Sequence, residues 1–561
     1  MIFKQQAKNQ DFQDLKFLSE FVILFFFKNK NNDSLTPLCI ASQNGYEDIA
    51  LILLENISID DLTDSTLHYA CSFGEEKFKL VKKILEKLNK FDKKRLENLL
   101  SSLDVFGKLI DNNHLNIIDM VLKEYNECVV DLVDTNNNTL IHLAAKSGST
   151  EILKLLIKHG CFSLKTNSND ENGLHIAAQN NRFKFIQDFL IYETIFVENL
   201  SNKVEISEEN EPLIHESDSA NEYIPSVNCL NKSGLTPLFL AINNGHLKSV
   251  ECLINGTDHI DYTAQDLEGN TIYHKCAELN NFESLRFLVT RKEKKYLDPL
   301  YIKNKNFDTV VTTASNYGHL EIIRLVLSKI YDGFTSPETY LLSKNSNGQN
   351  CFHIACSKGF YNIVEYFIKD LKMKFFLESV DQNLNKPIHL ASAGGYLSIV
   401  KILIQINIDI NARNDKGYTA LDISCRKGFF DISKVLITSF SGMKEFYNSQ
   451  NNEYPLHTAC QEGSYQVVDL LLSKGYPIDS KNNDNKNCLD IAIEYERREV
   501  IKVLLRNENW PKLIEISGVE SVKFPTNIRN TSIFQVNSII KAALFMRPKI
   551  KRESPQINEL I

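Results

Sequence analysis

Two stretches of the sequence show the pattern that decides the fold, Thr236-Pro237-Leu238-Phe239-Leu240-Ala241 and Thr139-Leu140-Ile141-His142-Leu143-Ala144. The fourth residue after each stretch is a glycine, and an apolar run follows the glycine. The residues aligned with the closing alanine, which we call anchors, are Ala41, Ala70, Leu109 (degenerate), Ala144, Ala177, Ala241, Cys276, Ala314, Ala355, Ala391, Ser424, Ala459 and Ala492. Successive anchors are 29, 39, 35, 33, 64, 35, 38, 41, 36, 33, 35 and 33 residues apart. The chain is therefore built from repeats of about 33 residues with a few insertions.

Each part of the repeat has a physical role that predicts a pair of helices. Thr or Asn caps the first helix, and Pro fits the first helical position, as in Thr36-Pro37 and Lys386-Pro387, because its missing N–H would have no partner there. The small anchor lets helices approach closely, and glycines such as Gly148 turn the chain with positive φ. Apolar residues at helical spacing, as in Ile399-Val400-Ile402-Leu403, give the second helix one buried face. A single repeat cannot bury that face alone, so the repeats must stack.

The start pattern, the small anchor, the turn glycine and the period together resemble the ankyrin repeat. We therefore expect an all-α ankyrin-repeat solenoid of about 13 helix-turn-helix repeats joined by short hairpin loops. The resemblance implies a concave groove lined by the first helices and by hairpin tips such as Asn345-Ser346-Asn347-Gly348 and Asn414-Asp415-Lys416-Gly417. A protein partner is expected in that groove.

The periodicity divides the chain into five predicted segments. They are an N-terminal capping helix in residues 1–30, repeats in 31–197, an acidic insertion loop in 198–230, repeats in 231–507, and a C-terminal junction and tail in 508–561. The gap of 64 residues between Ala177 and Ala241 admits either a decayed repeat or an insertion. We favour an insertion because residues 198–222 carry eight acidic residues and one lysine. It is either an acidic docking loop or a tolerated insertion.

Most of the histidines share one slot, two residues before the anchor. The slot contains His68, His142, His175, His274, His353, His389 and His457, whose anchors include Ala144, Ala355, Ala391 and Ala459. A shared register indicates a framework role, in which the imidazole bonds to the loop backbone. We expect no catalytic histidine.

The cysteines also follow the register of the repeats, which indicates small apolar filling. No pair has Cys-x-x-Cys spacing, so we expect no zinc or other metal, no cofactor and no redox site. Cys128, Cys161 and Cys229 lie between repeats or at their edges and are the candidates for a reactive thiol. The sequence contains no phosphate-binding glycine loop, nucleophile elbow or His-Glu-x-x-His motif, so an enzyme is not expected.

Charge and apolar runs argue against nucleic-acid-binding, membrane-spanning and secreted proteins. A net charge of −8 argues against a nucleic-acid partner, because such proteins carry a basic patch. The longest apolar run, Phe21 to Phe27, is too short to span a membrane, and no secretory signal follows it. We therefore expect a cytosolic chain with reduced thiols.

The end of the last repeat, Glu496-Arg497-Arg498-Glu499-Val500-Ile501-Lys502-Val503-Leu504-Leu505-Arg506-Asn507-Glu508-Asn509-Trp510, shows a further resemblance. It resembles the junction in ankyrin-type transient receptor potential (TRPA) cation channels, where a basic apolar helix runs into a Trp before the pre-membrane linker. The resemblance covers the repeats from about Ala144 and this junction, with Arg497, Arg498 and Trp510 as its family-like residues. A plug closing the last helix pair is the simpler role for Trp510. The family's electrophile-sensing cysteines have no counterpart in residues 511–561, which contain no Cys.

The resemblance implies that the chain is the cytosolic arm of a sensory channel subunit at the plasma membrane, without its pore, in a homotetramer. The alternative is a soluble ankyrin adaptor that holds a protein partner in its groove. The sequence does not name the ligand or the stimulus.

Overall fold

The structure is a computed structural model that describes only part of the chain. The described residues are 36–44, 46–57, 62, 66–67, 70, 78–91, 103–124, 132–161, 164–203, 225–290, 298–331, 337–372, 374–439 and 454–507. Within these ranges the chain forms helices and helical turns and no strand. It divides into two units, residues 1–299 and 300–561, which are described separately.

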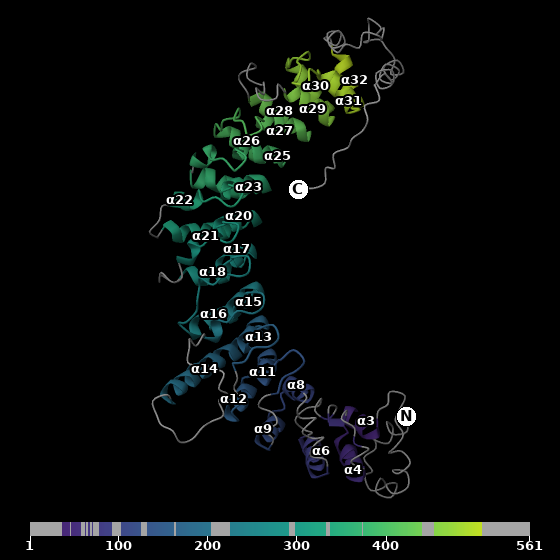
Figure 1. Ribbon diagram of the computed structural model, residues 1–561, viewed down its shortest axis with the longest axis vertical. Helices are drawn as coiled ribbons and strands as arrows, with labels where there is room; N and C mark the ends of the chain where they lie inside the picture. Colours follow the sequence, from purple (N-terminus) through teal and green to yellow (C-terminus); the bar gives the residue numbers. More distant parts are fainter. Residues whose placement is uncertain are drawn as a thin grey trace. The chain divides into compact units, whose positions relative to one another are not determined.

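The first unit alternates between the first and the second helix of successive repeats (Figure 1). Its first helices are α3 (Pro37–Asn44), α8 (Leu103–Asp111), α11 (Leu140–Ser147), α13 (Gly173–Gln179), α15 (Pro237–Asn243) and α17 (Ile272–Glu278). Its second helices are α4 (Glu47–Asn56), α6 (Phe78–Phe91), α9 (Leu115–Glu124), α12 (Thr150–Lys158), α14 (Phe183–Lys203), α16 (Leu247–Gly256) and α18 (Phe282–Val289). Helices of the same kind contact each other in chain order, from α8 to α17 and from α4 to α18.

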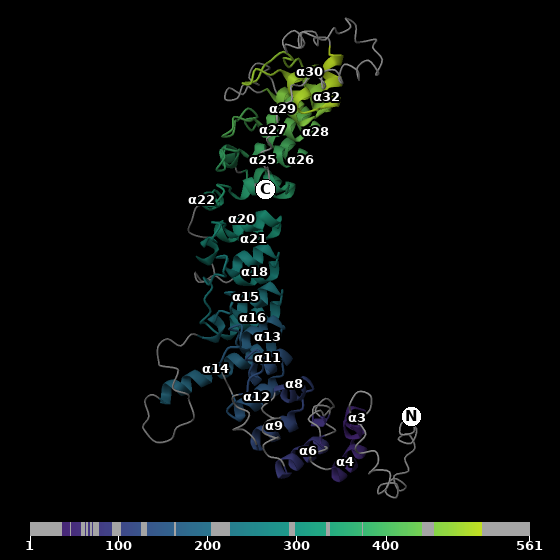
Figure 2. The ribbon, with the colours of Figure 1, turned by 45° about the vertical axis from the view of Figure 1, so that its right-hand side comes forward.

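The second unit has the same construction, which Figure 2 shows from a second side. Its first helices are α20 (Val310–Tyr317), α23 (Cys351–Lys358), α25 (Pro387–Ala393), α27 (Ala420–Lys427), α29 (Pro455–Glu462) and α31 (Cys488–Glu494). Its second helices are α21 (Leu320–Tyr331), α24 (Tyr361–Glu365) with the π-helical turn η5 (Tyr366–Asp370), α26 (Leu397–Gln405), α28 (Phe430–Ser439), α30 (Tyr465–Ser473) and α32 (Arg498–Arg506). The first helices contact each other in order from α20 to α31, and the second helices from α24 to α32.

The start of a first helix and the anchors show how a repeat is built. The helix α15 begins at Pro237, and the hydroxyl of Thr236 accepts a hydrogen bond from the Phe239 N–H at 3.3 Å. Apart from Ala70, every anchor lies in a described first helix, and Ala144, Ala355, Ala391 and Ala459 are fully buried. The core of each unit thus lies between its two layers of helices.

Short helical turns fill some of the insertions. The spacing of 41 residues before Ala355 contains α22 (Pro337–Leu341), from which the Tyr340 hydroxyl donates to the carbonyl oxygen of Leu300 at 2.9 Å. The spacing of 36 residues before Ala391 contains η6 (Lys374–Glu378).

The boundary predicted for the acidic insertion differs from the structure. Helix α14 continues to Lys203, beyond the expected end of the repeats at residue 197, and the turn η3 (Ser226–Asn228) precedes the next hairpin. Glu193 of α14 accepts a hydrogen bond from the Ser226 N–H at 2.9 Å, which holds the two ends of the insertion together. The remainder of the insertion, residues 204–224, and the predicted segments 1–30 and 508–561 lie outside the described residues.

Candidate functional site

Nine described hairpin loops begin with an Asn or Asp whose side chain holds the loop together. In the loop before α27, Asn414 Oδ1 accepts hydrogen bonds from the backbone N–H groups of Lys416 at 3.1 Å and Tyr418 at 2.9 Å. The same pair of bonds recurs in the loops that begin at Asp134, Asn167, Asn231, Asp266, Asn304, Asn345, Asp381 and Asn482. Because a side chain replaces missing backbone partners, these loops have a defined shape.

Backbone hydrogen bonds join neighbouring loops into a row. In the second unit the Ser346 N–H donates to the Asn306 carbonyl at 2.8 Å, and the Gln382 N–H donates to the Asn347 carbonyl at 3.1 Å. The next link runs from the Asp415 N–H to the Asn383 carbonyl at 3.0 Å. Within the second unit, the loops that begin at Asn304, Asn345, Asp381 and Asn414 therefore form one connected edge instead of separate tips.

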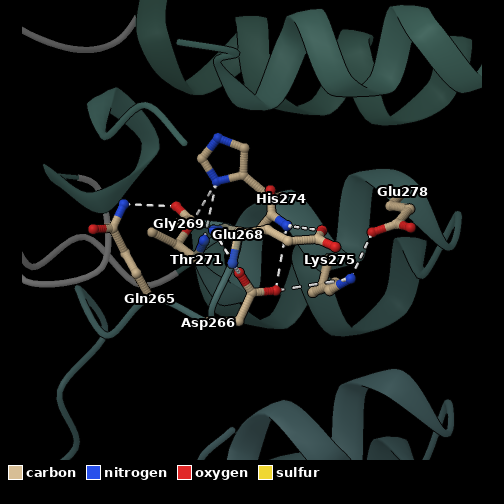
Figure 3. A network of polar contacts seen from close by, with 9 residues as sticks. Gln265, Asp266, Glu268, Gly269, Thr271, His274, Lys275 and Glu278 are labelled. Atoms are coloured by element: carbon tan, nitrogen blue, oxygen red, sulfur yellow. Dashed lines mark hydrogen bonds and ion pairs between the residues drawn. The ribbon is translucent and has the colours of Figure 1, made fainter. Parts of the chain in front are cut away.

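The loop edge continues onto the first helices. Asp266 accepts hydrogen bonds from the backbone N–H groups of Glu268 at 2.9 Å and Asn270 at 2.8 Å. Lys275 of α17 places its Nζ 3.8 Å from Asp266 and 2.8 Å from Glu278 (Figure 3). Burial lowers the pKa of Lys275, but the two carboxylates outweigh it, so the pKa is raised and the ammonium stays charged.

A second contact between a hairpin loop and a basic side chain of the following first helix lies in the other unit. The guanidinium of Arg426 in α27 lies 4.7 Å from the centroid of the Tyr418 ring, which belongs to the preceding loop. We call the hairpin loops together with the exposed ends of the first helices the hairpin face.

The histidine slot connects one repeat to the loop of the next. The Thr139 N–H donates to His142 Nδ1 at 3.0 Å, and His142 Nε2 lies 2.8 Å from the Glu171 carbonyl oxygen. A carbonyl oxygen only accepts, so these partners require a neutral ring with its proton on Nε2. The corresponding Nε2-to-carbonyl distances are 3.0 Å for His175 to Leu235, 3.2 Å for His353 to Ser379, 2.8 Å for His389 to Ala412 and 2.9 Å for His457 to Ser480.

Burial changes the titration of these rings. It lowers the pKa of His175 and of His353 to about 4, and it lowers the pKa of His142 and of His389. Desolvation disfavours the imidazolium ion, so these four rings are neutral at pH 7. A neutral, buried and doubly hydrogen-bonded ring is suited to joining repeats.

Arg497, one of the family-like residues, also joins two repeats. Its Nε donates to the Gln461 carbonyl at 2.7 Å, and its side chain covers Gly463. Arg182 has the same contact in the first unit, where its Nε donates to the Lys146 carbonyl at 3.0 Å. Repeat packing therefore accounts for Arg497 without a membrane linker. Arg498 is exposed, and Trp510 lies outside the described residues.

This contact predicts a difference between two neighbouring arginines. Arg497→Ala is expected to lower the free energy of unfolding by about 1 kcal/mol, because it removes a hydrogen bond and the packing of the side-chain stem. Arg498→Ala should change it by less than about 0.5 kcal/mol, since that side chain is exposed. Urea unfolding of both variants checks this. Equal losses would show that the contact with Gln461 contributes nothing.

The described thiols are poorly placed for reactivity. Cys161 is only 4% exposed, which does not suit the reactive thiol expected there. Burial raises the pKa of Cys229, and Glu193 raises it further, so this thiol is protonated at neutral pH. Cys128 lies outside the described residues.

The described residues also bear on metal binding and on membrane spanning. No three His, Cys, Asp or Glu side chains gather there in a way that could hold a metal ion. No described helix combines the length and the apolar character that crossing a membrane requires.

Two hairpin residues that the sequence pattern did not single out have an unusual backbone conformation. Phe307 and Leu384 occupy the fourth position of their loops with φ of +60° and +56°. Glycine, Asn or Asp takes this position in the loops at Asn137, Asp170, Gly234, Gly269, Gly348, Gly417 and Asn485. Aligning the loops on their opening Asn or Asp would have revealed the two exceptions.

The geometry defines a protein of stacked helical repeats, in which backbone hydrogen bonds join neighbouring hairpin loops within each unit. A family model described as ankyrin repeats in three copies matches residues 6–95, 108–199, 211–299, 372–445 and 440–512. These matches cover more than half of the chain, so the protein belongs to the ankyrin-repeat family, as predicted. Ankyrin repeats generally mediate protein–protein interactions.

Named relatives confirm the resemblance to TRPA channels. The chain is 22% identical over 457 residues to the transient receptor potential cation channel subfamily A member 1 homolog of Caenorhabditis elegans, covering 72% of this chain and 35% of that protein. It is 22% identical over 448 residues to the human transient receptor potential cation channel subfamily A member 1, covering 74% and 37%. It is also 24% identical over 395 residues to the NAD-dependent deacetylase sir2B of Dictyostelium discoideum, covering 66% and 47%. The chain spans less than half the length of each relative.

Proposed function

We propose that this ankyrin-repeat protein is a non-enzymatic binding module that acts in the cytosol and holds a protein partner on its hairpin face. The observation that carries the proposal is the row of loops that begin at Asn304, Asn345, Asp381 and Asn414, which backbone hydrogen bonds join and whose own Asn or Asp side chains hold them. A surface ordered before binding loses little conformational entropy when a partner arrives. The buried histidines support the same role, because five of them attach a loop to the preceding repeat.

Recovery of the full chain from its native cells tests this function. The tagged chain, purified after mild cross-linking, is expected to bring one protein partner at constant stoichiometry across salt concentrations. Recovery of the chain alone, or with partners in variable trace amounts, would count against a dedicated binding module.

We further propose that the module is the cytosolic arm of a TRPA-like sensory channel subunit, assembled as a homotetramer. The similarity to two channel proteins over 72% and 74% of this chain supports this assignment. The alternative is a soluble adaptor, and the similarity to a deacetylase favours the view that such repeats also serve other proteins.

Long-read sequencing of the native transcript beyond the codon for Ile561 separates these two settings. A reading frame that continues into apolar segments of about 20 residues would establish the channel arm. A stop codon directly after Ile561 would eliminate it and leave the adaptor.

A further inference from the structure

Phe307 and Leu384 are held in a backbone conformation that opposes their side chains. In the left-handed region the Cβ atom crowds the backbone, so bulky residues rarely adopt it. Their φ values of +60° and +56° lie in this region. Such strain persists only when the surrounding structure imposes it, and it concentrates at functional sites.

Burial does not compensate for this strain. The Phe307 side chain is 59% exposed and that of Leu384 is 50% exposed, so neither contributes a fully buried apolar side chain to the core. The loop between them, which contains Asn347, is bonded to both neighbouring loops. The two apolar tips therefore lie on one connected section of the hairpin face.

This section also carries an excess of positive charge. We define it as residues 303–308, 344–349, 381–385 and 414–418 with the ends of α20, α23, α25 and α27. Its exposed charged side chains are Lys303, Lys305, Lys344, Lys358, Lys416, Lys427 and one acid, Asp415. Tyr317, at the end of α20, adds a further exposed ring. The section thus combines apolar tips with a basic surround.

We propose that this section binds an extended acidic peptide segment of a partner protein, which places apolar side chains on Phe307 and Leu384. The inference rests on the proposed binding function and specifies its ligand chemistry. Acidic side chains complement the lysines and speed association, while apolar contacts at the tips supply affinity. A peptide is favoured over a nucleic acid because Leu384 offers no ring on which a base can stack.

Binding of defined peptides to the full chain tests the proposal. The probe is a fluorescent peptide that repeats Glu-Leu-Glu-Ser three times, and its controls replace every Glu by Gln or every Leu by Ser. The probe is expected to bind at least about tenfold more tightly than either control. Equal affinities would overturn the proposal, as would equally tight binding of a single-stranded oligouridylate of similar charge.

Variants of the chain locate the binding. Phe307→Gly combined with Leu384→Gly is expected to weaken binding of the probe about tenfold. Glycine relieves the strain, so the midpoint of thermal unfolding should stay the same or rise. The control Leu267→Gly removes an exposed apolar residue from a loop outside the section and should leave binding unchanged. Unchanged affinity of the double variant would overturn the proposal.

The contribution of charge is tested in the same way. Lys344→Ser combined with Lys416→Ser should weaken binding of the probe and reduce its salt dependence. The matched pair Lys401→Ser and Lys434→Ser, on the second helices α26 and α28, should do neither. If both pairs of substitutions weakened binding of the probe, net charge alone would explain the effect, and the proposal would be overturned. If a native partner is captured while the acidic peptides fail, this inference fails and the proposed function stands.

Discussion

Lowering the pH from 7 to 4 is expected to destabilise this protein steeply, with about 3 kcal/mol lost for each of His175 and His353. Their folded pKa of about 4 lies below the ordinary value near 6.5. Between these two values the unfolded chain binds protons that the folded chain does not. Stability is therefore fully present above about pH 6.5 and falls as the pH drops towards 4.

Another repeat of the chain has a threonine in the histidine slot, which suggests the variant for this test. Thr312 occupies the histidine slot in α20, where its hydroxyl accepts a hydrogen bond from the Thr309 N–H at 2.6 Å. His175→Thr should keep that kind of cap but lose the bond to the Leu235 carbonyl, lowering stability by about 1 kcal/mol at pH 7. It should also remove about 3 kcal/mol of the loss on acidification.

Urea unfolding at a series of pH values measures both effects. His259→Thr is the control, because His259 is exposed and lies outside the slot. The same pH dependence in the wild type and in His175→Thr would refute the buried, neutral state of the ring.

Gly359→Ala is expected to lower the free energy of unfolding by about 2–4 kcal/mol. Gly359 has φ of +84°, and an added Cβ would lie 2.3 Å from Cε1 of Tyr396 in the next repeat. Gly475 has φ of +81°, and no atom lies within 4 Å of its added Cβ. Gly475→Ala should therefore lower the free energy of unfolding by only about 1 kcal/mol, the cost of placing a Cβ in the left-handed region. The difference isolates the contact between repeats.

A double variant identifies the neighbour responsible. In a Tyr396→Ala background the loss from Gly359→Ala should shrink to that of Gly475→Ala, because the obstructing ring is gone. Chemical denaturation of the four proteins gives the coupling energy. Equal losses from the two single glycine variants, or no coupling with Tyr396, would contradict the packing described.

Features that repeat locally could be predicted from the sequence. The Thr236-Pro237 start, the buried anchors and the histidine slot depend on residues within a few positions of each other, and the structure has them where the pattern places them. Contacts between repeats were harder to foresee. The bond from Arg497 to Gln461 spans 36 residues, and only the stacked helices reveal it.

The special features of the candidate site required the loop geometry. Phe307 and Leu384 look like ordinary loop residues until the left-handed backbone at the fourth position is known. Cys161 lies at a repeat edge in the sequence, yet its side chain is buried in the structure. The backbone conformation of the loop and the burial of the thiol are properties of the folded chain, which the repeat pattern alone does not give.

Capture of the native partner by two matched pairs of variants tests the central claim most directly. Asn347→Trp with Asn383→Trp places two large rings on the hairpin face, while Ser398→Trp with Gln405→Trp places them on the second helix α26, and all four native side chains are exposed. With equal thermal stability of both proteins established first, the α26 pair should recover as much partner as the wild type, and the hairpin pair should recover almost none. Full recovery by the hairpin pair, or loss with the α26 pair alone, would contradict binding at the hairpin face.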